Sequence, residues 1–126
     1  MPFRRLAQRE LAAFFGVLSH PLRVGLLLAL VDGERDVSTL VDVTGSPQTA
    51  VSQALARLRS ARIVKERREG RHVYYSLIDP GLPQWLDSAY ALLEAETALA
   101  AERHAVIADA RAAVHMQRRK RTKGTR

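Results

Sequence analysis

The sequence of 126 residues predicts a mainly α-helical protein with one small two-stranded β-hairpin, an α+β fold class. A tight turn at residues 44–46 separates two short helical segments, and two strand-like segments follow up to Leu77. Ala- and Leu-rich helical segments lie on both sides of this region. A helix-turn-helix followed at once by a hairpin is a winged helix-turn-helix, an arrangement suited to duplex DNA.

The turn between the two helices is Thr44-Gly45-Ser46. Gly45 can adopt the positive φ that ends the first helix, and Ser46 is a preferred N-cap residue for the second. Pro47 then falls at the first helical position, where its missing N–H costs nothing. Three apolar residues follow at helical spacing and predict an inward stripe: Val51, Leu55 and Leu58.

The polar face of the second helix is the candidate DNA-reading surface. It carries Gln48, Thr49, Ser52, Gln53 and Arg57. Side chains of these types hydrogen-bond to base edges and phosphates in the major groove. We expect the first four to read bases and the arginine to contact phosphate or the minor groove. The alternative is an ordinary solvated face, against which the turn before the helix and the basic hairpin after it both argue.

The hairpin is indicated by alternation of polar and apolar side chains over residues 72–77, the period of a half-buried strand. Ile63 and Val64 begin the other strand. The tip, residues 67–71, supplies cations and a glycine for the chain reversal. We expect two of its arginines to lie near phosphates or in a minor groove: Arg68 and Arg71.

Helices are also predicted on both sides of this region, over residues 3–18, 21–31 and 84–117. The last segment contains no Pro or Gly and fits either one long helix or two with a break near Glu102. Its many Ala residues permit close helix approach. We therefore expect a homodimer whose seam is built from the first and last segments, the alternative being that the last one packs only on its own core.

A two-fold dimer would set its recognition helices about 34 Å apart and would prefer double-stranded DNA with an inverted repeat. The DNA-binding domain with its dimerisation helices then covers residues 1–117. The remaining residues, 118–126, form a basic tail that we expect to be disordered.

The net charge of +7 is unevenly distributed. Residues 46–72 carry 7 basic and 2 acidic side chains, whereas residues 73–117 carry 2 basic and 6 acidic ones. A positive band on the predicted reading surface is typical of a DNA-binding domain. No apolar run reaches the length of a membrane span and the N-terminus lacks the pattern of a secretory signal, so we expect a cytoplasmic protein.

Several chemistries are excluded or unsupported by composition. The chain has no cysteine, which excludes disulfides, thiolate metal sites and thiol redox sensing. It also lacks a Gly-rich phosphate loop, a nucleophile motif and a carboxylate pair in a recognisable context, so we expect no enzymatic activity.

Three motifs resemble the ArsR/SmtB family of small bacterial repressors: HPLR near the start, SPQTAVSQALARLRSARIV in the middle and GRHVYYSL at the wing. The resemblance covers roughly residues 10–95. It implies a winged-helix dimer that represses its own operon and leaves the DNA when a metal ion or another signal binds. Arg62 departs from the pattern, since the family usually has Gly there. The family's Cys-containing motif in the first helix of the helix-turn-helix is represented here by residues 37–40, without cysteine.

The resemblance also raises the question of a metal site. In the metal-sensing branch, the helix after the wing carries Asp-x-His, ten residues, then His-x-x-Glu or His. Asp79 matches the first position, and the others are Gly81, Leu92 and Ala95. The expected site is therefore absent.

The same spacing recurs 23 residues further along at Glu102, His104 and His115. On one helix the two histidines lie about 16 Å apart, so they could share a divalent ion (Zn, Ni or Co) only across an antiparallel partner. The alternative is a coincidence of two surface histidines.

The sequence thus predicts a homodimeric, sequence-specific regulator, most simply a repressor released from its operator by a signal that is not thiol-based. Two alternatives stay open. One is a DNA-binding regulator without a small-molecule effector, switched by a protein partner. The other is a helical protein-interaction module, which dependence of DNA binding on Gln48 and Ser52 would argue against.

Overall fold

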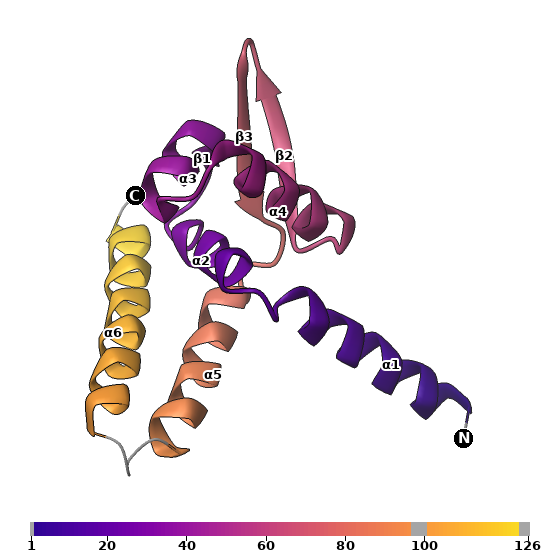
Figure 1. Cartoon of the computed structure of the whole chain (residues 1–126), viewed down its shortest axis with the longest axis vertical. Helices are drawn as coiled ribbons and strands as arrows, with labels where there is room; N and C mark the ends of the chain where they lie inside the picture. Colours follow the sequence, from indigo (N-terminus) through magenta and orange to yellow (C-terminus); the bar gives the residue numbers. More distant parts are fainter. Residues whose placement is uncertain (1, 97–100, 124–126) are drawn as a thin grey trace. The chain divides into compact units, whose positions relative to one another are not determined.

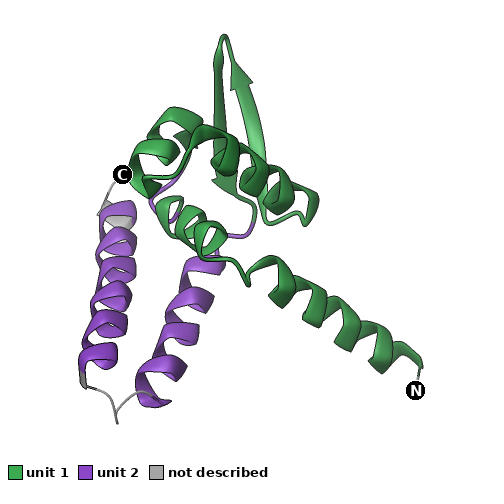
Figure 2. Cartoon of the chain, viewed as in Figure 1, with its two compact units in different colours: residues 1–30, 34–78 green, residues 31–33, 79–126 purple. Residues whose placement is uncertain are grey.

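The computed structural model describes residues 2–96 and 101–123 (Figure 1). The chain forms two compact units, the first made of residues 1–30 and 34–78 and the second of residues 31–33 and 79–126 (Figure 2). The first unit contains four helices and three strands: α1 (Pro2–Val17), α2 (Pro21–Ala29), β1 (Arg35–Asp36), α3 (Val37–Thr44), α4 (Gln48–Ser60), β2 (Val64–Glu69) and β3 (His72–Leu77). The second contains α5 (Leu82–Glu96) and α6 (Ala101–Lys123).

The core of the first unit lies where α2, α3 and α4 pack together. Fully buried side chains come from all three helices, and those of α4 recur at helical spacing: Leu26, Leu27, Leu40, Val51, Leu55 and Leu58. The inward stripe predicted for the second helix of the helix-turn-helix is thereby confirmed. Burial of this stripe turns the polar side of α4 outward.

The turn between α3 and α4 confirms one prediction and corrects another. Gly45 adopts a φ of 65° and its N–H donates to the Val41 carbonyl at 2.9 Å, closing α3 as expected. Ser46, however, is not the N-cap. Pro47 takes that position with an extended ψ of 146°, no side chain caps the helix, and α4 begins at Gln48.

The sheet has three antiparallel strands in the order β1-β3-β2, rather than the two predicted. Arg35 of β1 lies opposite Tyr75 of β3. A strand of two residues is too short to show alternation, so β1 could not be predicted from the sequence pattern. The hairpin tip is also shorter than predicted, because β2 continues to Glu69 and only Gly70 (φ 61°) and Arg71 connect the strands.

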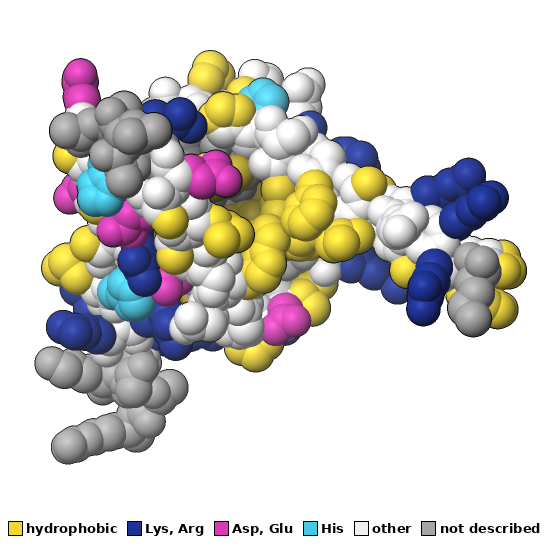
Figure 3. Space-filling view, turned by 90° about the horizontal axis from the view of Figure 1, so that it is seen from below, with side chains coloured by type: hydrophobic (Ala, Val, Ile, Leu, Met, Phe, Trp, Pro, Cys, Tyr) yellow, Lys and Arg dark blue, Asp and Glu magenta, His cyan; other side chains and the backbone are white. Residues whose placement is uncertain are grey.

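Helix α1 is exposed over nearly its whole length. Only Val17 is buried, whereas Phe3, Leu6, Leu11 and Phe15 are at least half exposed. Figure 3 shows Lys and Arg side chains along this helix toward its N-terminal end. Among the described residues no single helix has the length and apolar character of a membrane span; α1 and α2 meet that test only as a pair, and they are bent by 84° at their junction.

In the second unit α5 and α6 pack against each other (Figure 1). Of the two arrangements considered for residues 84–117, the structure has two helices, and residues 97–100 between them lie outside the described residues. The expectation of a disordered tail is wrong for residues 118–123, which continue α6. Arg and Lys are good helix formers and cations are favourable near a helix C-terminus. Arg121 also donates to the Val31 carbonyl at 3.3 Å; residues 124–126 are not described.

Candidate nucleic-acid interface

The five candidate reading residues on α4 all lie at the surface. Gln48, Thr49, Ser52, Gln53 and Arg57 are exposed, because the buried stripe occupies the opposite side of the helix. All five residues lie within the first three turns of α4. Side chains near the start of the second helix of a helix-turn-helix are the ones that reach base edges in the major groove.

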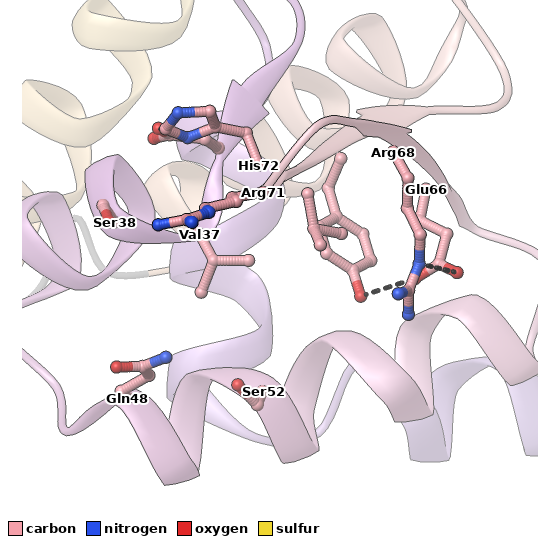
Figure 4. A pocket seen from close by; sticks show the side chains of 11 residues that line it. Val37, Ser38, Gln48, Ser52, Glu66, Arg68, Arg71 and His72 are labelled. Carbon is pink, nitrogen blue, oxygen red and sulfur yellow. Dashed lines mark hydrogen bonds and ion pairs between the residues drawn. The ribbon is translucent and has the colours of Figure 1, made fainter.

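A cleft of about 310 Å³ lies between α4, the start of α3 and the wing formed by β2 and β3. Gln48 and Ser52 face it from α4, while Arg68 and Arg71 border it from the wing (Figure 4). Four of the predicted site residues are therefore brought together around one cleft. The other three, Thr49, Gln53 and Arg57, lie on α4 outside its lining.

Glu66 on β2 connects the wing to the recognition helix. Its Oε2 accepts a hydrogen bond from the Tyr75 hydroxyl at 3.1 Å and lies 2.8 Å from Nη1 of Arg59 on α4. Its Oε1 lies 3.8 Å from Nε of Arg68. Burial, and then the hydrogen bond to Glu66, raise the pKa of Tyr75, so the hydroxyl stays protonated and can donate. This role of Glu66 was missed from the sequence.

Arg67 is held by the protein itself. Its Nη2 donates to Glu34 Oε1 at 2.6 Å, its Nη1 to Glu69 at 2.6 Å, and its guanidinium carbon lies 4.6 Å from the centre of the Tyr74 ring. The hydrogen bond from Arg67 lowers the pKa of Glu34, and the same bond raises the pKa of Arg67. The charge of Arg67 is thus already paired with carboxylates of the first unit. Arg57 and Arg71, in contrast, have no ion-pair partner among the described residues.

His72 borders the cleft from the first position of β3. Its Nδ1 lies 3.8 Å from Oδ2 of Asp36, whose Oδ1 accepts the Thr39 N–H at 2.9 Å and so caps α3. The hydrogen bonds from Thr39, and more weakly the proximity of His72, lower the pKa of Asp36. The carboxylate therefore fixes the start of α3 beside the wing.

The metal candidates lie in the second unit and are engaged with carboxylates of α5. His115 Nε2 is 2.9 Å from Asp87 Oδ1, and His104 Nε2 is 3.7 Å from Glu94 Oε1. Arg111 lies between them, donating to Asp87 at 3.0 Å and to Glu94 at 2.7 Å. Glu94, and then Asp87, raise the pKa of Arg111.

This arrangement does not fit a metal ion within one chain. A permanent cation such as Arg111 between the two carboxylates repels a divalent ion, and Glu102 is exposed on α6. No group of three or more His, Asp or Glu side chains in the described ranges could hold a metal. At the position that the family pattern favours, Asp79 instead accepts the Gly81 N–H at 2.7 Å. Sharing of an ion between two copies stays a prediction.

Comparison with known proteins connects this geometry to a family. The family model described as "Bacterial regulatory protein, arsR family" matches residues 20–66, from the residue before α2 to the third residue of β2. The biofilm growth-associated repressor of Xylella fastidiosa is 34% identical over 87 residues, which cover 69% of this chain and 76% of that protein. The chain belongs to the arsR family. The predicted resemblance is thereby confirmed.

Two further comparisons place the chain among arsR-family proteins. It is 45% identical over 71 residues, 56% of its length, to the transcriptional repressor SmtB homolog of a Synechocystis strain, and it spans about half the length of the first curated relatives that it matches. The crystal structure of NolR from Sinorhizobium fredii aligns with a TM-score of 0.66 at 28% identity, covering 73% of this chain and 92% of that one. The predicted α+β winged-helix fold is confirmed.

Proposed function

We propose that this arsR-family chain is a sequence-specific, double-stranded-DNA-binding repressor that acts in the cytoplasm as a homodimer. The observation that carries the proposal is the cleft around which Gln48 and Ser52 of α4 meet Arg68 and Arg71 of the wing. Such a surface combines amide and hydroxyl groups for base edges with guanidinium groups for the phosphate backbone.

We assign each residue a role in DNA binding from its chemistry and its position. Gln48 and Ser52, on the cleft, and Thr49 and Gln53, on the adjoining exposed face, would read base edges. Arg57 would bind a phosphate beside the major groove. Arg71 would contact phosphate or the minor groove at the wing, and Arg68 would do so where the operator draws it away from Glu66, 3.8 Å from its Nε.

Exposed apolar side chains support the homodimer. In α1 Phe3 is 82% exposed, and in the second unit Leu92 and Val106 are 71% and 68% exposed. Large apolar side chains on helices that cover little of their own chain are typical of surfaces that bind another chain. A two-fold pair would bind an inverted repeat with half-sites about 34 Å apart.

The releasing signal is proposed not to be a thiol reaction, because the chain has no cysteine. Zinc, nickel and cobalt are the ions to test, since His104 and His115 are the only pair of candidate nitrogen ligands on the C-terminal helix. Replacing both by Ala and finding unchanged binding of all three ions would remove the metal hypothesis.

The test is fluorescence anisotropy of the protein on a duplex from upstream of its own gene and on a scrambled duplex of equal length, with and without each ion or a chelator. We expect a preference of about 10³-fold or more for the upstream duplex, the range of specific readers. Equal, salt-sensitive binding to both duplexes would overturn the proposal and favour the helical interaction module instead. Specific binding that no ion changes would favour a regulator switched by a protein partner.

A further inference from the structure

We propose that Glu66 is a specificity-determining residue of the reading surface, a positioning carboxylate that ties the wing to the recognition helix and keeps two arginines out of undirected phosphate contact. This inference rests on the proposed function, because it concerns how the same surface distinguishes one DNA sequence from another.

Three partners from three different elements converge on this one carboxylate. Arg59 comes from the last turn of α4, Arg68 from β2 itself and Tyr75 from β3. The contact to Arg59, at 2.8 Å, is within the range of charge-assisted hydrogen bonds, and the Tyr75 hydroxyl donates to the carboxylate at 3.1 Å. Glu66 is 25% exposed and Tyr75 only 8%, so the junction is partly shielded from water and from salt.

The position of Glu66 decides what the contacts do. Glu66 lies opposite Tyr75 in the β2–β3 ladder, so the hydroxyl and the carboxylate are held at fixed register. Arg59 extends from the last turn of α4. The ion pair therefore fixes the angle between the helix that enters the major groove and the wing beside it. Base reading and wing contacts need that angle to be the same each time.

The charges give the second part of the argument. Arg59 and Arg68 are 47% and 74% exposed, so both could reach a phosphate if nothing held them. Phosphate contacts raise affinity for every sequence alike, whereas base contacts raise it for one. A carboxylate that engages both arginines lowers the sequence-independent part of binding and leaves the base-reading part in place.

The experiment replaces Glu66 by Gln in the full-length chain and measures anisotropy on the upstream and scrambled duplexes between about 50 and 200 mM salt. We expect affinity for the scrambled duplex to rise and the ratio of the two affinities to fall at least tenfold. The plot of log affinity against log salt should steepen by up to about 2 per protomer, from two freed phosphate-binding cations.

The matched control is Glu69→Gln, which makes the same charge change on the same strand. Glu69 is 70% exposed and its partner is Arg67, which keeps its bonds to Glu34. We expect the ratio to change less than twofold in this variant. A second control, Arg59→Gln, breaks the same ion pair without freeing a cation, so it should lower the ratio without raising affinity for the scrambled duplex.

The outcomes separate this inference from the proposed function. If the wild-type chain prefers the upstream duplex but Glu66→Gln and Glu69→Gln behave alike, Glu66 acts only through net charge and the inference is wrong. If Glu66→Gln unfolds at a lower temperature but keeps the wild-type ratio, its role is structural and the inference is again wrong. If the wild-type chain itself shows no preference, the proposed function fails first.

Discussion

Arg62 is the residue whose replacement gives the sharpest test of the backbone at the reading surface. It follows α4 and adopts a φ of 59°, the one positive φ at a non-glycine residue among the described residues. Its N–H donates to the Arg59 carbonyl at 2.9 Å, and the next N–H, of Ile63, donates to the Leu58 carbonyl at 3.0 Å. This pair of bonds is a Schellman motif, whose left-handed position is usually glycine.

We expect Arg62→Gly to stabilise the protein. The left-handed conformation costs a residue with a Cβ about 1–2 kcal/mol, and glycine adopts it freely. Glycine also has more conformational freedom in the unfolded chain, which favours unfolding and offsets about 0.4–1 kcal/mol of the relief of backbone strain. The net gain is about 0.5–1 kcal/mol, which for a chain of this size raises the midpoint of thermal unfolding by roughly 2–5 °C.

The assay is thermal and urea unfolding followed by circular dichroism, with Arg62→Ala as control. Alanine removes the same charge and side chain but keeps the strained φ, so we expect no gain from it. Equal midpoints for the Gly and Ala variants would refute the argument from backbone strain. A rise shared by both would instead trace the effect to the arginine charge.

Three further predictions concern single residues of the first unit. Gln48→Ala should weaken binding to the upstream duplex by about 1–3 kcal/mol, the value of a good bidentate base contact, and leave the scrambled duplex unchanged in the same titration. Arg71→Ala should weaken binding to both duplexes and lower the salt slope by about 1 per protomer, as measured from 50 to 200 mM salt. Asp36→Ala should lower the unfolding midpoint at neutral pH by removing the cap of α3. The folded state lowers the pKa of Asp36 below the ordinary 3.8, so its contribution is present above that pH and is lost as the pH falls through the lowered value. A difference in unfolding midpoint between Asp36→Ala and wild type that does not shrink as the pH is lowered below 3.8 would contradict this.

Those parts of the fold that depend on neighbours in sequence could be predicted from it. The glycine turn before α4, the hairpin and the outward polar face of α4 each follow from local conformational preference and periodicity. The N-cap at Ser46 was predicted wrongly: Pro47 itself has an extended ψ of 146°, so the helix begins one residue later, at Gln48. The disordered tail was predicted from charge alone, without weighing the helix propensity of Arg and Lys.

Contacts between distant residues could not be predicted in this way. Arg67 and Glu34 are 33 positions apart, and their ion pair depends on how the segment before β1 meets the wing. In the sequence Glu66 is one of two acidic residues in a basic hairpin, and its spacing does not indicate that Arg59 and Tyr75 both contact it. The α5–α6 carboxylate and histidine pairs likewise required the two helices to be placed side by side.

These contacts change what the basic charge of the reading surface means. Residues 46–72 carry seven basic side chains, but three of them are engaged by carboxylates: Arg59, Arg67 and Arg68. On the scrambled duplex the charge free to neutralise phosphate is therefore at most that of the other four, which limits the salt slope from this region to about −4 per protomer at 0.9 per contact. A measured slope near −6 or steeper per protomer would mean that the ion pairs open on DNA, or that the basic end of α6 also binds it. Glu66→Gln distinguishes the two, because it steepens the slope only if the pairs are closed.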